Sequence, residues 1–168
     1  ADLLLPGLVA RPGAAAGLRE IASPLPQPVP DDWVPADKSL AALIRAEHAL
    51  GRGDTATAAR EADLAWELDR SVNAREVQAR AYAAAGRAAE AAAAYADVSS
   101  RASERIDALD KPGFHRVVEA EYRLGVLLDD IGEPGRARQL FERVLLVRGV
   151  AFDGAREADA RRRLARMR

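Results

Sequence analysis

The stretch that decides the fold runs from residue 120 to residue 147 and reads AEYRLGVLLDDIGEPGRARQLFERVLLV. Apolar residues recur in it three and four positions apart, which is the spacing of one face of an α-helix. Gly132 and Pro134 divide it, because glycine commonly follows the end of a helix and proline suits a first helical turn. The stretch therefore predicts two helices joined by a short turn.

Two earlier stretches share this pattern. Gly53, Gly86 and Gly132 each stand between two helical segments, and successive glycines are 33 and 46 residues apart. The positions five, nine and twelve residues after these glycines hold Ala58, Ala62 and Ala65, then Ala91, Tyr95 and Val98, then Ala137, Phe141 and Val144. Each set of three lies on one helix face. The sequence thus predicts a repeated helical hairpin.

At these residues the chain resembles the tetratricopeptide repeat family, whose repeat is a helix–turn–helix of about 34 residues with small residues at fixed inner positions. The resemblance covers residues 39–148, with residues 120–147 the best copy, 75–98 the next and 39–69 the weakest. It implies an all-α fold, a right-handed α-solenoid of three antiparallel helix pairs. We expect a further helix over residues 154–167 to cap the stack.

Proline marks the first boundary in the chain. Seven of the nine prolines lie within residues 1–35, and four of them alternate with other residues from Pro24 to Pro30. Such a segment is extended. We therefore predict a Pro-rich N-terminal arm over residues 1–36 and a helical repeat domain over residues 37–168. Because the chain begins with alanine and not methionine, we expect a processed form or a piece of a longer protein.

Composition excludes several classes of protein. The 38 alanines and only eight aromatic residues exclude an all-β fold. The absence of cysteine excludes disulfides, iron–sulfur ligation and thiol nucleophiles. With 25 basic and 26 acidic residues the charge balance does not favour nucleic acid as a partner. No apolar run is long enough for a membrane span. A bacterial cytoplasm and a periplasm both fit this composition.

Catalytic and metal-binding patterns are missing from the sequence. The turn Gly-Arg-Gly-Asp at residues 51–54 lacks the lysine and the hydroxyl residue of a phosphate loop. The only two histidines are His48 and His115, which make at most part of a metal site. The neighbouring Asp129 and Asp130 diverge on a helix and do not converge on one substrate atom. We therefore predict no metal, no cofactor and no enzymatic activity.

What remains is recognition of another protein. In the resembled family the first helix of each pair lines a concave groove that binds peptides. The corresponding positions here are Asn73, Glu76, Arg80 and Ala84 on one helix and Glu119, Tyr122, Val126 and Asp129 on another. Acidic residues outnumber basic ones in this set, so a basic, arginine-containing or apolar segment would suit the groove. Tyr122 is its one aromatic residue and the best candidate anchor.

Two functions follow from this reading. The first is a non-catalytic scaffold or adaptor that binds a peptide or partner protein through the concave face. The alternative is a C-terminal regulatory or docking module of a larger enzyme, whose catalytic part precedes residue 1.

The charges are distributed unevenly along the chain. Residues 133–168 carry a net charge of +5 and residues 39–132 a net charge of −4. Arginines of the last helix are typical of the polar outer face of a capping helix. The alternative is a basic docking patch for an acidic partner or nucleic acid. The asymmetry also predicts that copies of the chain could self-associate.

Overall fold

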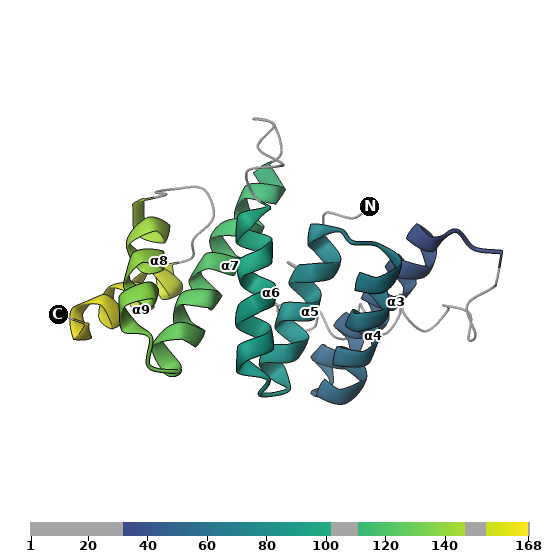
Figure 1. Ribbon diagram of the computed structural model, residues 1–168, viewed down its shortest axis with the longest axis horizontal. Helices are drawn as coiled ribbons and strands as arrows, with labels where there is room; N and C mark the ends of the chain where they lie inside the picture. The colour runs from purple at the N-terminus through teal and green to yellow at the C-terminus, as the bar shows by residue number, and fades with distance from the viewer. Residues whose placement is uncertain (1–31, 102–110, 147–153, 168) are drawn as a thin grey trace. The chain divides into compact units, whose positions relative to one another are not determined.

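The computed structural model describes residues 32–101, 111–146 and 154–167 of the chain, and within these ranges every regular element is an α-helix (Figure 1). The helices are α3 (Pro35–Gly51), α4 (Thr55–Leu68), α5 (Val72–Ala84), α6 (Ala88–Ser100), α7 (Lys111–Asp130), α8 (Pro134–Leu146) and α9 (Gly154–Arg166). The all-α prediction is therefore confirmed for the described residues. None of these helices is both long and apolar enough to cross a membrane. The predicted arm lies, up to residue 31, outside the described residues.

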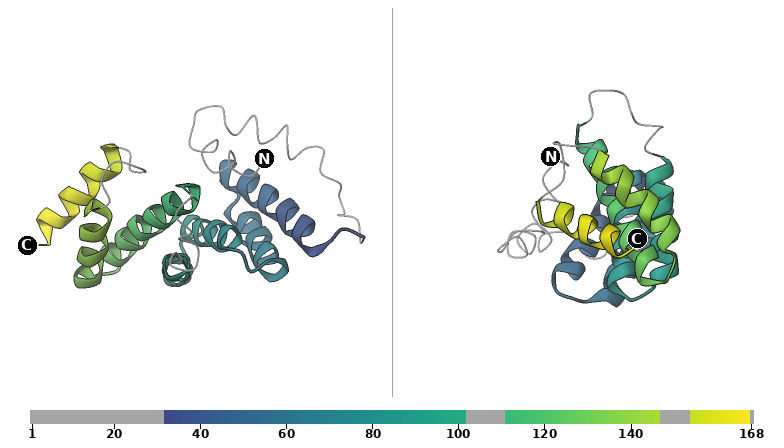
Figure 2. Two further views of the ribbon diagram at one scale, coloured as in Figure 1. Left: turned by 90° about the horizontal axis from the view of Figure 1, so that it is seen from above. Right: turned by 90° about the vertical axis from the view of Figure 1, so that its left-hand side faces the viewer.

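The chain divides between Arg87 and Ala88 into two compact units. In unit 1, α4 packs against both α3 and α5, and α3 also contacts α5. In unit 2, α7 packs against both α6 and α8, and α9 contacts α8 (Figure 2). Helices that follow one another in the chain are therefore packed together within each unit.

The three predicted turns share one geometry. Gly53, Gly86 and Gly132 have φ angles of 74°, 73° and 84°, a left-handed region that glycine enters without steric cost. The residue after each glycine donates its N–H to a carbonyl five residues earlier, in the pairs Asp54 to Ala49, Arg87 to Tyr82 and Glu133 to Leu128. This is the Schellman motif, which satisfies carbonyls at the end of a helix. The prediction of turns at these glycines is confirmed.

The residues predicted on a common helix face form the core. All nine of them are at most 1% exposed: Ala58, Ala62, Ala65, Ala91, Tyr95, Val98, Ala137, Phe141 and Val144. In unit 1 the core is mostly alanine, with Val77 as the largest side chain of its main cluster. In unit 2, Gly125 of α7 faces the Phe141 ring of α8, and a Cβ at Gly125 would lie 2.9 Å from the ring atom Cε1. Small residues thus set a close approach between paired helices.

Helix starts agree with the sequence in one case and differ in others. An aspartate directly after Gly53 predicts a helix cap, and Asp54 does cap α4. The hydrogen bond from the Thr57 N–H lowers the pKa of the Asp54 carboxyl group. The spacing of Asn73 and Glu76 in the sequence predicts a capping box. This prediction is wrong, because α5 begins at Val72 and the Ser71 hydroxyl accepts the Ala74 N–H at 3.2 Å. The sequence Lys-Pro-Gly at residues 111–113 predicts the end of a helix, but these residues form the first turn of α7.

The contact of Gly125 with Phe141 predicts a stability difference. Gly125→Val should lower the free energy of unfolding by about 1–3 kcal/mol, since the new side chain must push the Phe141 ring out of a packed site. Urea denaturation of the full chain measures this change. Gly135→Val is the matched control, because Gly135 also lies in a helix and has open space beside it; its effect should stay within about 0.5 kcal/mol. Equal effects of the two substitutions would contradict the close-approach explanation.

Candidate functional site

The structure places the predicted groove residues on two helices, one in each unit. Asn73, Glu76 and Arg80 lie on α5 of unit 1, whereas Glu119, Tyr122, Val126 and Asp129 lie on α7 of unit 2. Most of these side chains are half-buried, while Glu76 is buried. The two sets have different surroundings.

In unit 1 the guanidinium of Arg80 links α5 to α3. Its Nη1 and Nη2 donate to the two carboxylate oxygens of Glu47 at 2.5 and 3.0 Å, and Glu76 lies 3.8 Å from Nη1. Glu47 is 4% exposed and Glu76 is 5% exposed. Such a buried pair is worth little in net stability but is costly to break. Arg80 and Glu76 therefore have a structural task in holding α5 against α3.

Further polar side chains tie α4 to its neighbours in unit 1. Arg45 of α3 donates to Glu61 of α4 at 2.7 Å. Asp63 of α4 accepts hydrogen bonds from the Tyr82 hydroxyl at 2.6 Å and from Gln78 Nε2 at 2.7 Å, both on α5. These hydrogen bonds pair polar side chains at the contacts of α4 with its neighbours, where the buried core consists mostly of alanine.

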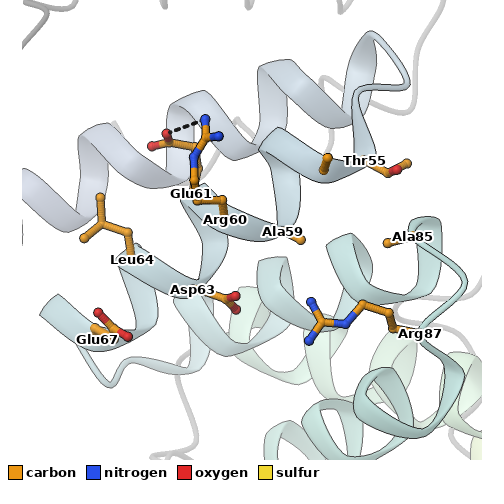
Figure 3. A pocket seen from close by; sticks show the side chains of 10 residues that line it. Thr55, Ala59, Arg60, Glu61, Asp63, Leu64, Glu67, Ala85 and Arg87 are labelled. Atoms are coloured by element: carbon orange, nitrogen blue, oxygen red, sulfur yellow. Dashed lines mark ion pairs between the residues drawn. The ribbon is translucent and has the colours of Figure 1, made fainter.

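The outer side of α4 contains a hollow of about 580 Å³, closed at one end by the residues that follow α5 (Figure 3). Asp63 and Arg87 point toward one another across it. Both already interact within unit 1, because Asp63 accepts two hydrogen bonds and Arg87 lies 4.1 Å from the centre of the Tyr82 ring.

In unit 2 the side chain of Tyr122 reaches from α7 to both α8 and α9. Its ring lies 6.1 Å from that of Phe141, centre to centre, at 57°, and its hydroxyl donates to Asp159 of α9 at 2.8 Å. Burial and the neighbouring carboxylate, both of which disfavour the phenolate, raise the pKa of Tyr122 to about 12.

The carboxylates of α7 pair with arginines of α9. Glu119 lies 3.0 Å from Arg156. Asp129 and Asp130 both accept from Nη1 of Arg163, at 2.5 and 2.9 Å. Neighbouring positions on a helix predict that Asp129 and Asp130 diverge, but one long arginine side chain reaches both.

Asp159 is the acidic residue of α9 at this contact. It accepts hydrogen bonds from Tyr122, Arg163 and Arg162. Burial opposes its ionisation, but these hydrogen bonds prevail and hold the pKa of Asp159 below its ordinary value. For Arg163, burial likewise opposes the charge, and the surrounding carboxylates prevail and raise its pKa. Both groups are therefore ionised at neutral pH.

Three of the four α7 residues that the sequence predicts to bind a partner thus contact α9. This contact was not predicted from the sequence. Only Val126 has no ion pair or hydrogen bond of this kind. A signal was present, since residues 156, 159 and 163 are three and four positions apart and share one helix face. The pairing of these residues with α7 could not be predicted, because the spacing within one helix does not identify the helix against which it packs.

The side chains described on both surfaces are polar or charged, apart from that of Val126. Among the side chains that the structure describes, no group of three or more histidines, cysteines or carboxylates is placed to hold a metal ion. The side chain of His115 lies outside the described residues. The surfaces consist of carboxylates, guanidinium groups, one amide and one phenol, which suit ion pairing and hydrogen bonding.

No protein-family model, curated protein or solved structure matches the chain.

The ion pair between Arg80 and Glu47 predicts a large stability effect. Arg80→Met should lower the free energy of unfolding by about 3 kcal/mol, because it removes the guanidinium from a buried carboxylate. Arg60→Met is the matched control: the Arg60 side chain is 71% exposed and lies 3.6 Å from Glu61, so its loss should cost at most about 0.5 kcal/mol. Chemical denaturation compares the two variants. An Arg80→Met cost no larger than that of the control would show that this pair does not hold α5 to α3.

The hydroxyl of Tyr122 predicts an alkaline transition. Its folded-state pKa of about 12 exceeds the ordinary value of about 10, so its contribution to stability is complete below pH 10 and is lost as the pH rises toward 12. The tyrosinate absorbance of the wild type minus that of Tyr122→Phe isolates this group. Asp159→Asn should shift its titration toward pH 10. A titration that is the same in both backgrounds would disprove the coupling between Tyr122 and Asp159.

Proposed function

We propose that this chain is a non-catalytic scaffold or adaptor with tetratricopeptide-like repeats, arranged as an α-solenoid that α9 caps. It binds a peptide or a partner protein through the faces of the first helices of its pairs. The observation that carries the proposal is the repetition itself: three turns of one geometry, each followed by buried residues at the same three offsets. Repeated hairpins of this kind create extended surfaces for binding other proteins.

The charge of these faces supports a basic partner. The α7 face carries Glu119, Asp129 and Asp130, with the phenol of Tyr122 among them. A segment that supplies arginine would find carboxylates for its guanidinium groups and an aromatic ring beside them. On α5 the half-buried Asn73 offers an uncharged amide.

Two substitutions test the proposal without disturbing the ion pairs described above. Asn73→Arg on α5 and Val126→Arg on α7 each place a positive charge on a proposed binding face, where it would repel a basic partner. Gln139→Arg is the matched control, since Gln139 is exposed on α8, the second helix of its pair. With the full chain as bait in cell lysate, each face variant should recover at least about tenfold less of the specific partner than the control.

The same capture experiment has outcomes that count against the proposal. A partner recovered equally by all three variants would bind elsewhere on the chain. A bait that captures no partner would instead favour the alternative, a module that acts on a catalytic domain in the same polypeptide.

A further inference from the structure

The helix α9 lies on the α7 face that is proposed to bind a partner, and it contacts this face as a bound helix would. Glu119, Tyr122 and Asp129 of α7 meet Arg156, Asp159 and Arg163 of α9 in the same order along the two helices. The Arg163 side chain is 18% exposed, and that of Asp129 is 19% exposed. An arginine-bearing helix thus covers the face proposed to bind a basic partner.

The apolar part of this contact is small. Ala160 is the one residue of α9 that is fully buried, among those described. Leu164 is half-buried, while Arg161, Arg162 and Arg166 are exposed. The remaining attraction comes from ion pairs between partly exposed side chains, which stabilise little and are screened by salt. A helix held in this way can be exchanged for another helix that offers the same charges.

We infer that this face of α7 is a receptor for an arginine-bearing helix of a partner protein, and that α9 is the intramolecular occupant which the partner displaces. This inference rests on the proposed function and specifies the partner for it. The partner helix carries two arginines seven residues apart with a carboxylate three residues after the first, as in Arg156, Asp159 and Arg163 of α9.

The geometry explains why the partner must supply arginine in particular. One guanidinium nitrogen of Arg163 bridges Asp129 and Asp130, while its Nε donates to Asp159. A lysine ammonium is a compact point charge on a flexible stem and does not reproduce this fork of donors. The carboxylate between the arginines is needed as well, because it accepts the Tyr122 hydroxyl.

Competition between α9 and the partner has a measurable consequence. While α9 occupies the face, only the fraction of molecules with α9 displaced can bind, so the apparent dissociation constant rises by the inverse of that fraction. Weakening α9 without changing α7 must therefore strengthen binding of an external helix.

The test uses a fluorescent synthetic peptide of residues 154–168 as the probe and full chains as receptors. Arg156→Glu combined with Arg163→Glu should make the receptor bind the peptide at least about tenfold more tightly than the wild type does, because the internal competitor is weakened. Adding Asp129→Arg to this double variant should abolish its gain in affinity for the peptide. Arg136→Glu combined with Arg138→Glu is the control with the same change in charge, and it should behave like the wild type, because those arginines are exposed and pair with Glu133 and Glu142.

A second peptide tests the chemistry of recognition. We call the receptor that carries Arg156→Glu and Arg163→Glu the loosened receptor. With Arg163→Lys in the peptide, binding of the peptide to the loosened receptor should weaken about tenfold. If the loosened receptor loses helical circular dichroism, Arg163→Lys in the receptor replaces it and should still raise affinity for the original peptide several-fold. Equal affinity of wild-type and loosened receptors, or binding that survives Asp129→Arg, would overturn the inference.

The other outcomes separate this inference from its premises. A wild-type dimer in sedimentation that dissociates with Arg163→Glu would make a second copy the occupant and overturn the assignment to a partner. If the peptide fails to bind while partner capture still depends on Asn73 and Val126, this inference falls and the proposed function stands. If the peptide binds as expected while capture ignores both positions, the proposed function falls instead.

Discussion

The close approach of paired helices is the constraint on which the rest of each unit depends. At the contact of α7 with α8 there is no room for a Cβ on Gly125, because the Phe141 ring already occupies that space. In unit 1 alanines have the same effect, and Ala46, Ala58 and Ala62 are fully buried there. Helices packed through such small residues present little apolar area, so each contact removes little surface from water. The hydrophobic effect brings the helices together but leaves their alignment weakly specified.

Polar contacts between helices supply that specification. Arg80 pairs with Glu47 across α5 and α3, and Arg163 pairs with Asp129 across α9 and α7. In each unit an arginine of one helix pairs with a carboxylate of the helix two places earlier in the chain. The two pairs differ in burial, since Glu47 is almost inaccessible whereas the Asp129 side chain retains about a fifth of its exposure. The first pair is therefore more costly to open than the second.

Much of the fold was predictable from the sequence because helix periodicity and turn chemistry are local. The glycine turns and the buried positions after them follow from spacing alone, and Tyr95 and Phe141 occupy the expected places. The start of α5 was missed by two residues, because Ser71 competes successfully with Asn73 as the cap. The contacts of Arg80 and Asp129 could not be predicted from the sequence, for a different reason. Either residue could face solvent or another helix, and only the packing of distant segments decides which.

The contacts that hold α9 in place are made by residues of the candidate site. A helix with one fully buried alanine gains little from burial, so its position depends on Tyr122 and on the α7 carboxylates. Those are the same side chains that the sequence assigns to partner binding. A surface cannot be specific for arginine-bearing helices and also remain indifferent to one tethered beside it, since equal chemistry gives comparable attraction. In the proposed exchange, the affinity of this face for an outside helix is therefore set by the difference between the two contacts, and the charges of α9 determine how much of that attraction the partner can use.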